Sequence, residues 1–213
     1  MEKERQEWLK KRSKGLGGSD AAAIVGLNQW KTNVRLWEEK TGRVNPEDIS
    51  GKDVVQYGIS AEPLLRELFK LDFPQYEVGY QEYFLHKHQE HDFLYATLDG
   101  ELTEKETGEK GVLEIKTSQI MNSAMMLKWK GRIPDSYYIQ ILHQLLVTGW
   151  DFAVMKANLK TEWFDETTIY NKHYTIKRSE VIKDMKFLLE KELYFWNHNV
   201  LKDIKPNLIL PSI

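Results

Sequence analysis

The sequence contains no cysteine, which excludes disulfide bonds and thiolate metal sites from its 213 residues. No apolar run approaches the roughly 20 residues that a membrane-spanning helix needs. The first fourteen residues are mostly charged and lack the apolar core of a signal peptide. Internal repeats, low-complexity tracts and linkers rich in proline, glycine or serine are also missing. These absences predict a cytoplasmic protein without a membrane segment and one domain that spans residues 1–213.

The composition is that of a globular protein, with 41% hydrophobic and 12% aromatic residues. The net charge of −2 gives no general sign of nucleic-acid binding, but two stretches are basic. Residues 1–14 hold six basic against three acidic residues, and residues 110–132 hold five basic residues against Glu114 alone. Such stretches can line a groove for a polyanion, although solvated surface faces are their commoner explanation.

Hydrophobic periodicity and capping signals predict helices first, then strands, then both in alternation. The predicted helices cover 2–12, 19–26, 33–42, 59–70, 136–149 and 179–201, and the predicted strands cover 76–85, 93–102, 111–118, 152–159 and 167–175. Ser19 and Ser179 are predicted helix N-caps, and Pro63 is expected in a first turn. This order predicts an α/β (α+β) fold in which helices flank a central mixed β-sheet.

One predicted strand carries two charged residues among apolar ones. In the stretch GVLEIKTS, Glu114 and Lys116 share one face, whereas Leu113 and Ile115 point into the core. An Asp-Gly pair at Asp99 precedes the polar ELTEKETGEKG, which is typical of a hairpin tip that returns the chain to Glu114. Two carboxylates with a lysine nearby suit Mg²⁺ or Mn²⁺. A surface Glu–Lys pair explains E-x-K alone more simply, and the upstream Asp-Gly favours the metal site.

The Asp-Gly pair, the hairpin and E-I-K together resemble the signature of the PD-(D/E)xK nuclease superfamily. More narrowly, the chain resembles the lambda exonuclease and YqaJ-type phage recombinase nucleases. The resemblance rests on six stretches in order: RSKGLGGSDAAAIVGLNQWKT, YGISAEPLLRELF, ATLDGEL, LEIKTS, YYIQILHQLLVTG and the closing FW-x-H-x-V. It implies a restriction-endonuclease-like core, with a central mixed sheet and flanking helices, and a DNA-hydrolysing reaction.

The resemblance also implies a metal centre. It assigns Asp99 and Glu114 as ligands of Mg²⁺, with the carbonyl of Ile115 completing the shell of one ion. Lys116 becomes the residue that orients or deprotonates the attacking water. Glu62 matches a family carboxylate near a second Mg²⁺, and Mn²⁺ is expected to substitute. Without the resemblance, Glu62 would be explained as an acidic residue in the first turn of a helix.

A glutamine is expected near the scissile phosphate, and two residues compete for the role. Gln140 and Gln144 are one helical turn apart and share a face, so the sequence does not choose between them. Polar edges of an amphipathic helix would explain both. The chain departs from the family pattern at Leu98, where the superfamily name has proline, and at Asn122. Lambda exonuclease carries a phosphate-gripping arginine at the Asn122 position, so the resemblance implies a weaker end-binding pocket here.

The stretch GLGGSD reads as a loop that enters a helix. It is not a nucleotide-binding P-loop, because no Gly-Lys-Ser/Thr follows it. Free N–H groups at a helix N-terminus favour an anion, and a cap without any ligand is the plainer alternative. Arg12, Ser19 and Thr97 match family positions that hold the 5′-phosphate of a DNA end.

The resemblance thus predicts a Mg²⁺-dependent 5′→3′ double-strand DNA exonuclease of phage recombination. The products would be 5′-mononucleotides and a 3′ single-stranded tail. The implied partners are duplex DNA ends, a phage single-strand annealing protein and two further copies in a homotrimeric ring. The implied setting is the cytoplasm of a bacterial host, with the gene carried by a phage or prophage. An endonuclease on the same fold and a non-catalytic DNA-binding scaffold are the alternatives.

Overall fold

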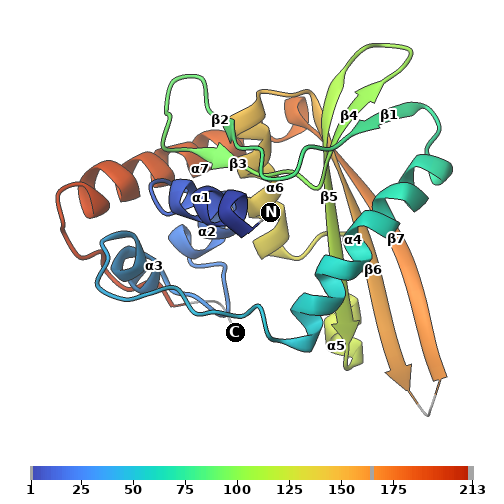
Figure 1. Cartoon of the computed structure of the whole chain (residues 1–213), viewed down its shortest axis with the longest axis horizontal. Coiled ribbons are helices and arrows are strands. Elements are labelled where there is room, and N and C mark those ends of the chain that lie inside the picture. Colours follow the sequence, from blue (N-terminus) through green and yellow to red (C-terminus); the bar gives the residue numbers. More distant parts are fainter. Residues whose placement is uncertain (1, 164–165, 211–213) are drawn as a thin grey trace.

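The computed structural model describes residues 2–163 and 166–210. In order the elements are α1 (Glu2–Arg12), α2 (Gly18–Ile24), α3 (Asn33–Lys40), α4 (Asp53–Asp72), β1 (Tyr76–Gly79), β2 (His86–Lys87), β3 (Tyr95–Ala96), β4 (Gly100–Glu104), β5 (Lys110–Ile120), α5 (Ser123–Leu127), α6 (Asp135–Thr148), β6 (Phe152–Trp163), β7 (Glu166–Lys177), η1 (Arg178–Glu180), α7 (Ile182–Tyr194) and η2 (Phe195–Val200). Figure 1 shows α4 on one side of the large sheet and most other helices on the opposite side. No helix in these described ranges is long and apolar enough to cross a membrane.

The large sheet is mixed and has the strand order β1-β4-β5-β6-β7. β5 and β6 are parallel, with Gly111 beside Phe152, whereas the other neighbouring strands are antiparallel. The connection from β5 to β6 carries α5 and α6, as a parallel crossover requires. The predicted mixed sheet flanked by helices is therefore confirmed.

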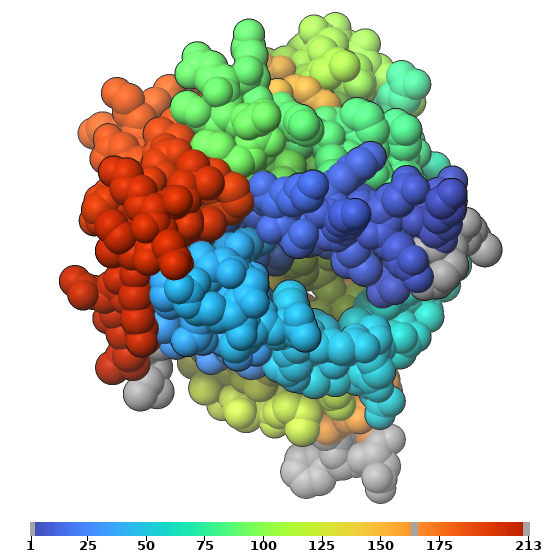
Figure 2. Space-filling view, turned by 60° about the vertical axis from the view of Figure 1, so that its left-hand side comes forward, coloured from blue at the N-terminus to red at the C-terminus, as the bar shows by residue number. Residues whose placement is uncertain are grey.

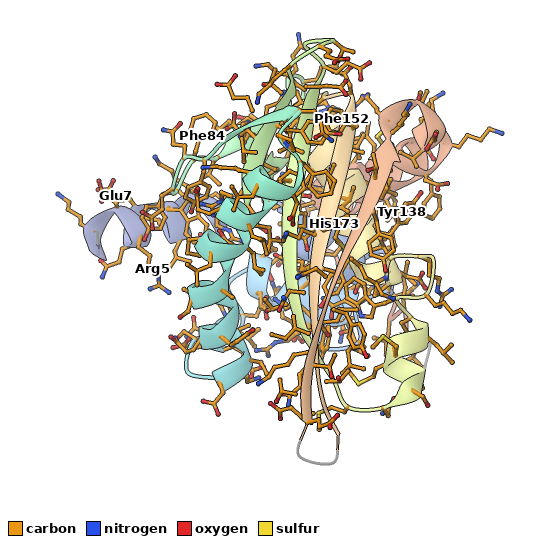
Figure 3. All side chains as sticks on the ribbon, turned by 90° about the vertical axis from the view of Figure 1, so that its right-hand side faces the viewer. Arg5, Glu7, Phe84, Tyr138, Phe152 and His173 are labelled. Carbon is orange, nitrogen blue, oxygen red and sulfur yellow. The ribbon has the colours of Figure 1, made fainter. Side chains whose placement is uncertain are left out.

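Both faces of the sheet are covered around β5. Val112 belongs to a large core that includes α2, α6 and α7, whereas Leu113 and Ile115 belong to a smaller core under α4. In that smaller core, Phe152 and His173 lie between α4 and the strands (Figure 3). The sequence assigned only one face of this strand to the core. That prediction was wrong, because the crossover places α6 on the face that carries Glu114.

Several predicted boundaries were wrong. α4 begins at Asp53, and Pro63 lies in its interior. The proline is tolerated because it is exposed, so water can reach the carbonyl that lost its N–H partner. Ser179 lies in η1 and caps nothing, and α7 gives way to a π-helix at Phe195. The predicted strand 76–85 ends at Gly79.

Candidate active site

Glu114 is the centre of a buried polar cluster on β5. Glu114 as a whole is 1% exposed. Oε1 accepts hydrogen bonds from Gln140 Nε2 at 2.6 Å and from Lys116 Nζ at 2.5 Å, and Oε2 accepts one from Gln144 Nε2 at 2.5 Å. A buried carboxylate is costly unless charge and hydrogen bonds compensate it, and these three donors do so. Both glutamines thus bind the same carboxylate, and which of them lies near the scissile phosphate stays a prediction.

Asp99 lies immediately before β4 and faces the same point of β5. Its Oδ2 accepts a hydrogen bond from the N–H of Ile115 at 2.7 Å. The antiparallel register, with Gly100 beside Leu113, places Asp99 next to Glu114, as the hairpin predicted. Burial and then the negative charge of Glu114 raise the pKa of Asp99 well above its ordinary value, and Lys116 offsets this only in part.

Lys116 is the counter-ion of the two carboxylates. Its side chain is 23% exposed, so the ammonium reaches the surface of the cluster while it contacts Glu114. Burial disfavours the charged amine, but Glu114 and Asp99 outweigh that penalty and raise the pKa of Lys116. The lysine therefore stays protonated and acts as a hydrogen-bond donor in this arrangement. Its Nζ also lies 5.4 Å from the ring centre of Tyr137 at the start of α6.

Glu62 approaches the cluster from α4. It pairs with Arg66 NH2 at 2.5 Å, and Nε of the same arginine donates to the carbonyl of Asp99 at 2.5 Å. Burial, together with the charge of Glu114, raises the pKa of Glu62 despite this arginine. Because α4 begins nine residues earlier, at Asp53, the explanation of Glu62 as a first-turn residue is wrong. Arg66 was not among the predicted site residues; its sequence signal is the spacing of one helical turn from Glu62, which does not reveal its contact with Asp99.

The candidate metal ligands are all oxygen atoms, which suits a hard divalent cation. Asp99, Glu114 and the Ile115 carbonyl offer only oxygen ligands, which Mg²⁺ prefers. Burial and the negative charge of Glu114 raise the pKa of Asp99, and a cation bound there would favour its ionised form. In the described part of the chain, no three His, Asp or Glu side chains are gathered closely enough to hold one ion. Asp99 and Glu114 are thus the candidate carboxylate ligands of one ion, and Glu62 does not share that ion with them.

The glycine-rich loop between α1 and α2 is held against β3 by backbone pairing. The N–H of Leu16 donates to the carbonyl of Phe93, and the N–H of Tyr95 donates to the carbonyl of Leu16. A Cβ on Gly15 would lie 2.2 Å from the Phe93 oxygen, and one on Gly17 would lie 2.8 Å from the Tyr95 ring. The glycines are therefore required by close approach of the loop to this strand.

Ser19 does not cap α2. The helix begins at Gly18 after Gly17 as its N-cap, and Asp20 Oδ2 accepts the N–H of Gly17 at 3.1 Å. The predicted cap role was wrong because Gly17 occupies the N-cap position, and Ser19 is exposed in the first turn. A Cβ on Gly18 would lie 3.0 Å from Cγ of Gln140, so the first turn of α2 packs directly beside a residue that donates a hydrogen bond to Glu114.

Arg12 and Thr97 lie on the two segments that pair at this loop. The partly exposed guanidinium of Arg12, the last residue of α1, lies 4.3 Å from the ring centre of Trp8. Its carbonyl accepts the hydroxyl of Tyr95 at 2.5 Å. Thr97 follows β3, and its carbonyl accepts a long hydrogen bond from Gln144. Of these two residues, Thr97 is linked to the Glu114 cluster through Gln144, whereas the side chain of Arg12 packs against Trp8 of its own helix.

The surface beside the loop is hollowed. Figure 2 shows a hollow bounded by the dark-blue residues of α1, the light-blue residues beyond α2 and the cyan start of α4. The surface visible inside it is olive, the colour of the residues that lead into and begin α6. The hollow therefore opens toward the helix that carries Gln140 and Gln144.

Asn122 is used for local structure. Its side chain accepts the N–H of Met125 at 2.9 Å and so caps α5. An arginine at this position would not supply that cap. The departure from the family pattern therefore has a structural use in this chain.

The chain shares its fold with solved exonucleases. The alkaline exonuclease LHK-Exo from Laribacter hongkongensis aligns with a TM-score of 0.65 at 17% identity, over 93% of this chain and 94% of its own. LHK-Exo in complex with dAMP aligns with a TM-score of 0.62 at 18% identity, over 93% and 98%. A phage-related exonuclease from Haemophilus somnus aligns at 0.58 and 13% identity, over 89% and 96%.

The sequence defines the family. The chain belongs to the YqaJ-like viral recombinase domain family, whose model matches residues 7–151. The uncharacterized protein YqaJ of Bacillus subtilis is 35% identical over 213 residues, which are 97% of this chain and 60% of that protein. The chain thus spans 60% of the length of this relative. The resemblance inferred from the order of the motifs is confirmed, and the matched region contains every candidate residue from Arg12 to Gln144.

Proposed function

We propose that the protein is a metal-dependent nuclease that hydrolyses DNA phosphodiester bonds. The observation that carries the proposal is the convergence of Asp99, Glu114 and Lys116 at the start of the β4–β5 hairpin. Two carboxylates and an ammonium around one point are the parts that metal-assisted phosphodiester hydrolysis needs. A scaffold gains nothing from burying like charges together, because their mutual repulsion destabilises the fold.

In this proposal Mg²⁺ binds Asp99, Glu114 and the Ile115 carbonyl. When bound, it supplies a Lewis acid for the phosphate and an acidified water. Gln140 and Gln144 fix the orientation of Glu114, since each donates to one of its oxygens. Lys116 holds a proton at Nζ, with which it orients the attacking water or contacts a phosphate oxygen. A second Mg²⁺ would use Glu62, and Mn²⁺ would replace either ion.

The finer activity is a 5′→3′ exonuclease on duplex DNA that leaves a 3′ single-stranded tail. The packing of the Arg12–Gly18 loop against Gln140 supports it, because recognition of an end then lies beside the candidate hydrolysis centre. The dAMP complex of a structural neighbour contains the class of mononucleotide such a reaction releases. A phage annealing protein that takes up the tail in the bacterial cytoplasm completes the proposal. An endonuclease on the same fold is the alternative.

Linear and circular duplex DNA separate these activities. With Mg²⁺, we expect linear DNA labelled at both ends to be shortened stepwise from its 5′ ends, while closed circles persist and a chelator stops the reaction. The measurement is gel analysis of the DNA together with chromatography of the products. Nicked circles would favour the endonuclease, and binding without cleavage in Mg²⁺ or Mn²⁺ would contradict the nuclease proposal.

A homotrimer is proposed for the assembled enzyme, and α4 offers a surface for association. Its solvent side carries Leu64, which is 71% exposed, and Leu71, which is 79% exposed. Apolar residues that repeat along one helix face mark interaction sites when nothing covers them. Val54, Tyr57 and Leu68 extend the same face.

Light scattering tests the assembly. We expect three times the 25.1 kDa chain mass, and we expect the double variant Leu64→Glu, Leu71→Glu to fall to the monomer mass with its thermal unfolding unchanged. Ile182→Glu, on the exposed side of α7, is the matched control and should keep the assembly. A monomeric wild type would refute the trimer. A trimer that tolerates the double variant would move the interface away from α4.

A further inference from the structure

His143 and Glu192 form a pair without solvent exposure between α6 and α7. His143 Nδ1 lies 2.6 Å from Glu192 Oε1, and Nε2 lies 2.9 Å from the carbonyl oxygen of Tyr95. The Tyr95 carbonyl can only accept, so Nε2 donates to it, and Nδ1 faces a carboxylate that accepts a second hydrogen bond from the protonated ring. Burial alone would lower the pKa of His143, but Glu192 and the Tyr95 carbonyl outweigh it and raise the pKa.

Tyr95 connects the His143–Glu192 pair to the glycine-rich loop. Its N–H donates to the carbonyl of Leu16 at 3.0 Å, and its hydroxyl donates to the carbonyl of Arg12 at 2.5 Å. Its ring packs against Gly17 so closely that a side chain there would collide with it. The residue bound by His143 therefore holds the loop at both of its ends.

The same turn of α6 faces Glu114. Gln140 and Gln144 stand on either side of His143 in the sequence, and both donate to that carboxylate. Gly18 fits between the loop and this turn, since a Cβ there would lie 3.0 Å from Gln140 Cγ and 3.7 Å from His143 Cδ2. One helical turn thus contacts both the loop and the candidate hydrolysis centre.

We propose that the His143–Glu192 ion pair is a positioning device that fixes the Arg12–Gly18 loop relative to Glu114. Recognition of a DNA 5′ end then depends on His143 being protonated, and this part of the inference rests on the proposed function. His143 is a positioning residue, because it acts through Tyr95 and α6 and contacts no candidate metal ligand.

The charges around His143 favour its protonated form. Glu192 of α7 is negative, and Asp20 of α2 adds a weaker negative charge that Lys40 of α3 partly neutralises. His88, which follows β2, also interacts electrostatically with both members of this pair. The α6 side of β6 is apolar, with Ala153, Met155 and Ala157 in the core. Removal of the Glu192 charge is therefore sufficient to change the titration.

The variant Glu192→Gln tests the proposal through its pH profile. We measure the ratio of degradation rates on duplexes with 5′-phosphate and 5′-hydroxyl ends from pH 6 to pH 9, because the ratio cancels the pH dependence of the chemistry common to both. The charge of Glu192 is the main cause of the raised pKa of His143. In the Glu192→Gln variant, the ratio of the two degradation rates should therefore decline at a pH at least one unit lower than in the wild type. At pH 8 the ratio should fall severalfold. Glu190→Gln, exposed on the same helix, should match the wild type.

A second measurement needs no DNA, so failure of the nuclease proposal does not affect it. Nitrogen-15 NMR of histidine should show both His143 nitrogens protonated at pH 8. In Glu192→Gln the amides of Leu16 and Tyr95 should exchange faster, while that of Leu36 keeps its protection. Glu192→Asp, which retains the carboxylate, should restore slow exchange and the wild-type profile; it also serves if the glutamine variant does not fold. A neutral His143 in the wild type, or unchanged exchange of the two amides, overturns the proposal.

Discussion

Lys116→Ala is expected to lower the rate of DNA hydrolysis by about 10²–10³-fold, the usual cost of removing one positioned hydrogen-bond donor from the transition state. The physical reason is that the Lys116 ammonium, which contacts Glu114 and keeps its proton because its pKa is raised, orients the attacking water or contacts a phosphate oxygen. The variant should still bind Mg²⁺, because it loses no oxygen ligand. Removal of a competing positive charge should even favour the cation. Single-turnover rates and calorimetric titration with Mg²⁺ measure the two effects separately.

Asp99→Ala supplies the contrast, since it should lose both activity and metal binding. Lys110→Ala, an exposed lysine at the start of the same strand, is the matched control and should cut at the wild-type rate. Thermal unfolding of each variant verifies that the fold is retained. A Lys116→Ala enzyme with wild-type turnover would refute the role of the lysine, and an Asp99→Ala enzyme with unchanged metal affinity would refute the metal site.

The central cluster was predictable because its determinants are local in sequence. Glu114 and Lys116 share a face by the alternation of a strand, and Asp99 reaches them through a hairpin only sixteen residues from Ile115. The crossover between β5 and β6 was equally visible as a helix between two apolar strands. Short separations allow pattern and turn chemistry to decide which side chains meet.

Contacts between distant elements were not predictable. Arg66 reaches the carbonyl of Asp99 across 33 positions, and His143 reaches Glu192 across 49. Each depends on how α4 and α7 pack, which the residues on one helix do not determine. Ser19 failed as a cap for a local reason. The helix begins one residue earlier, so Gly17 is the N-cap, and Tyr95 packs against Gly17 so closely that a side chain there would collide with it.

Arg12→Ala is expected to remove most of a preference for 5′-phosphorylated ends. If Arg12 contacts the terminal phosphate, wild-type protein should degrade 5′-phosphate duplexes roughly tenfold faster than 5′-hydroxyl duplexes, since a charge-assisted hydrogen bond contributes about 1.5–3 kcal/mol. We expect the lower end of this range because Asn122 is occupied in capping α5. Initial rates at low salt on the two substrates measure the preference, which should weaken as salt rises.

Arg5→Ala is the control for this measurement, because Arg5 is an exposed arginine on the same helix (Figure 3). It should keep the full preference while it removes one positive charge, and so separates a specific contact from the general attraction of α1 for DNA. The Arg12 carbonyl remains bonded to Tyr95 in the Arg12→Ala variant, so the loop itself should stay in place. Equal wild-type rates on 5′-phosphate and 5′-hydroxyl ends would mean that the glycine-rich loop only packs against its neighbours and does not bind the phosphate. If Arg12→Ala retained the preference for 5′-phosphate ends, the phosphate contact would instead be assigned to Ser19 or Thr97.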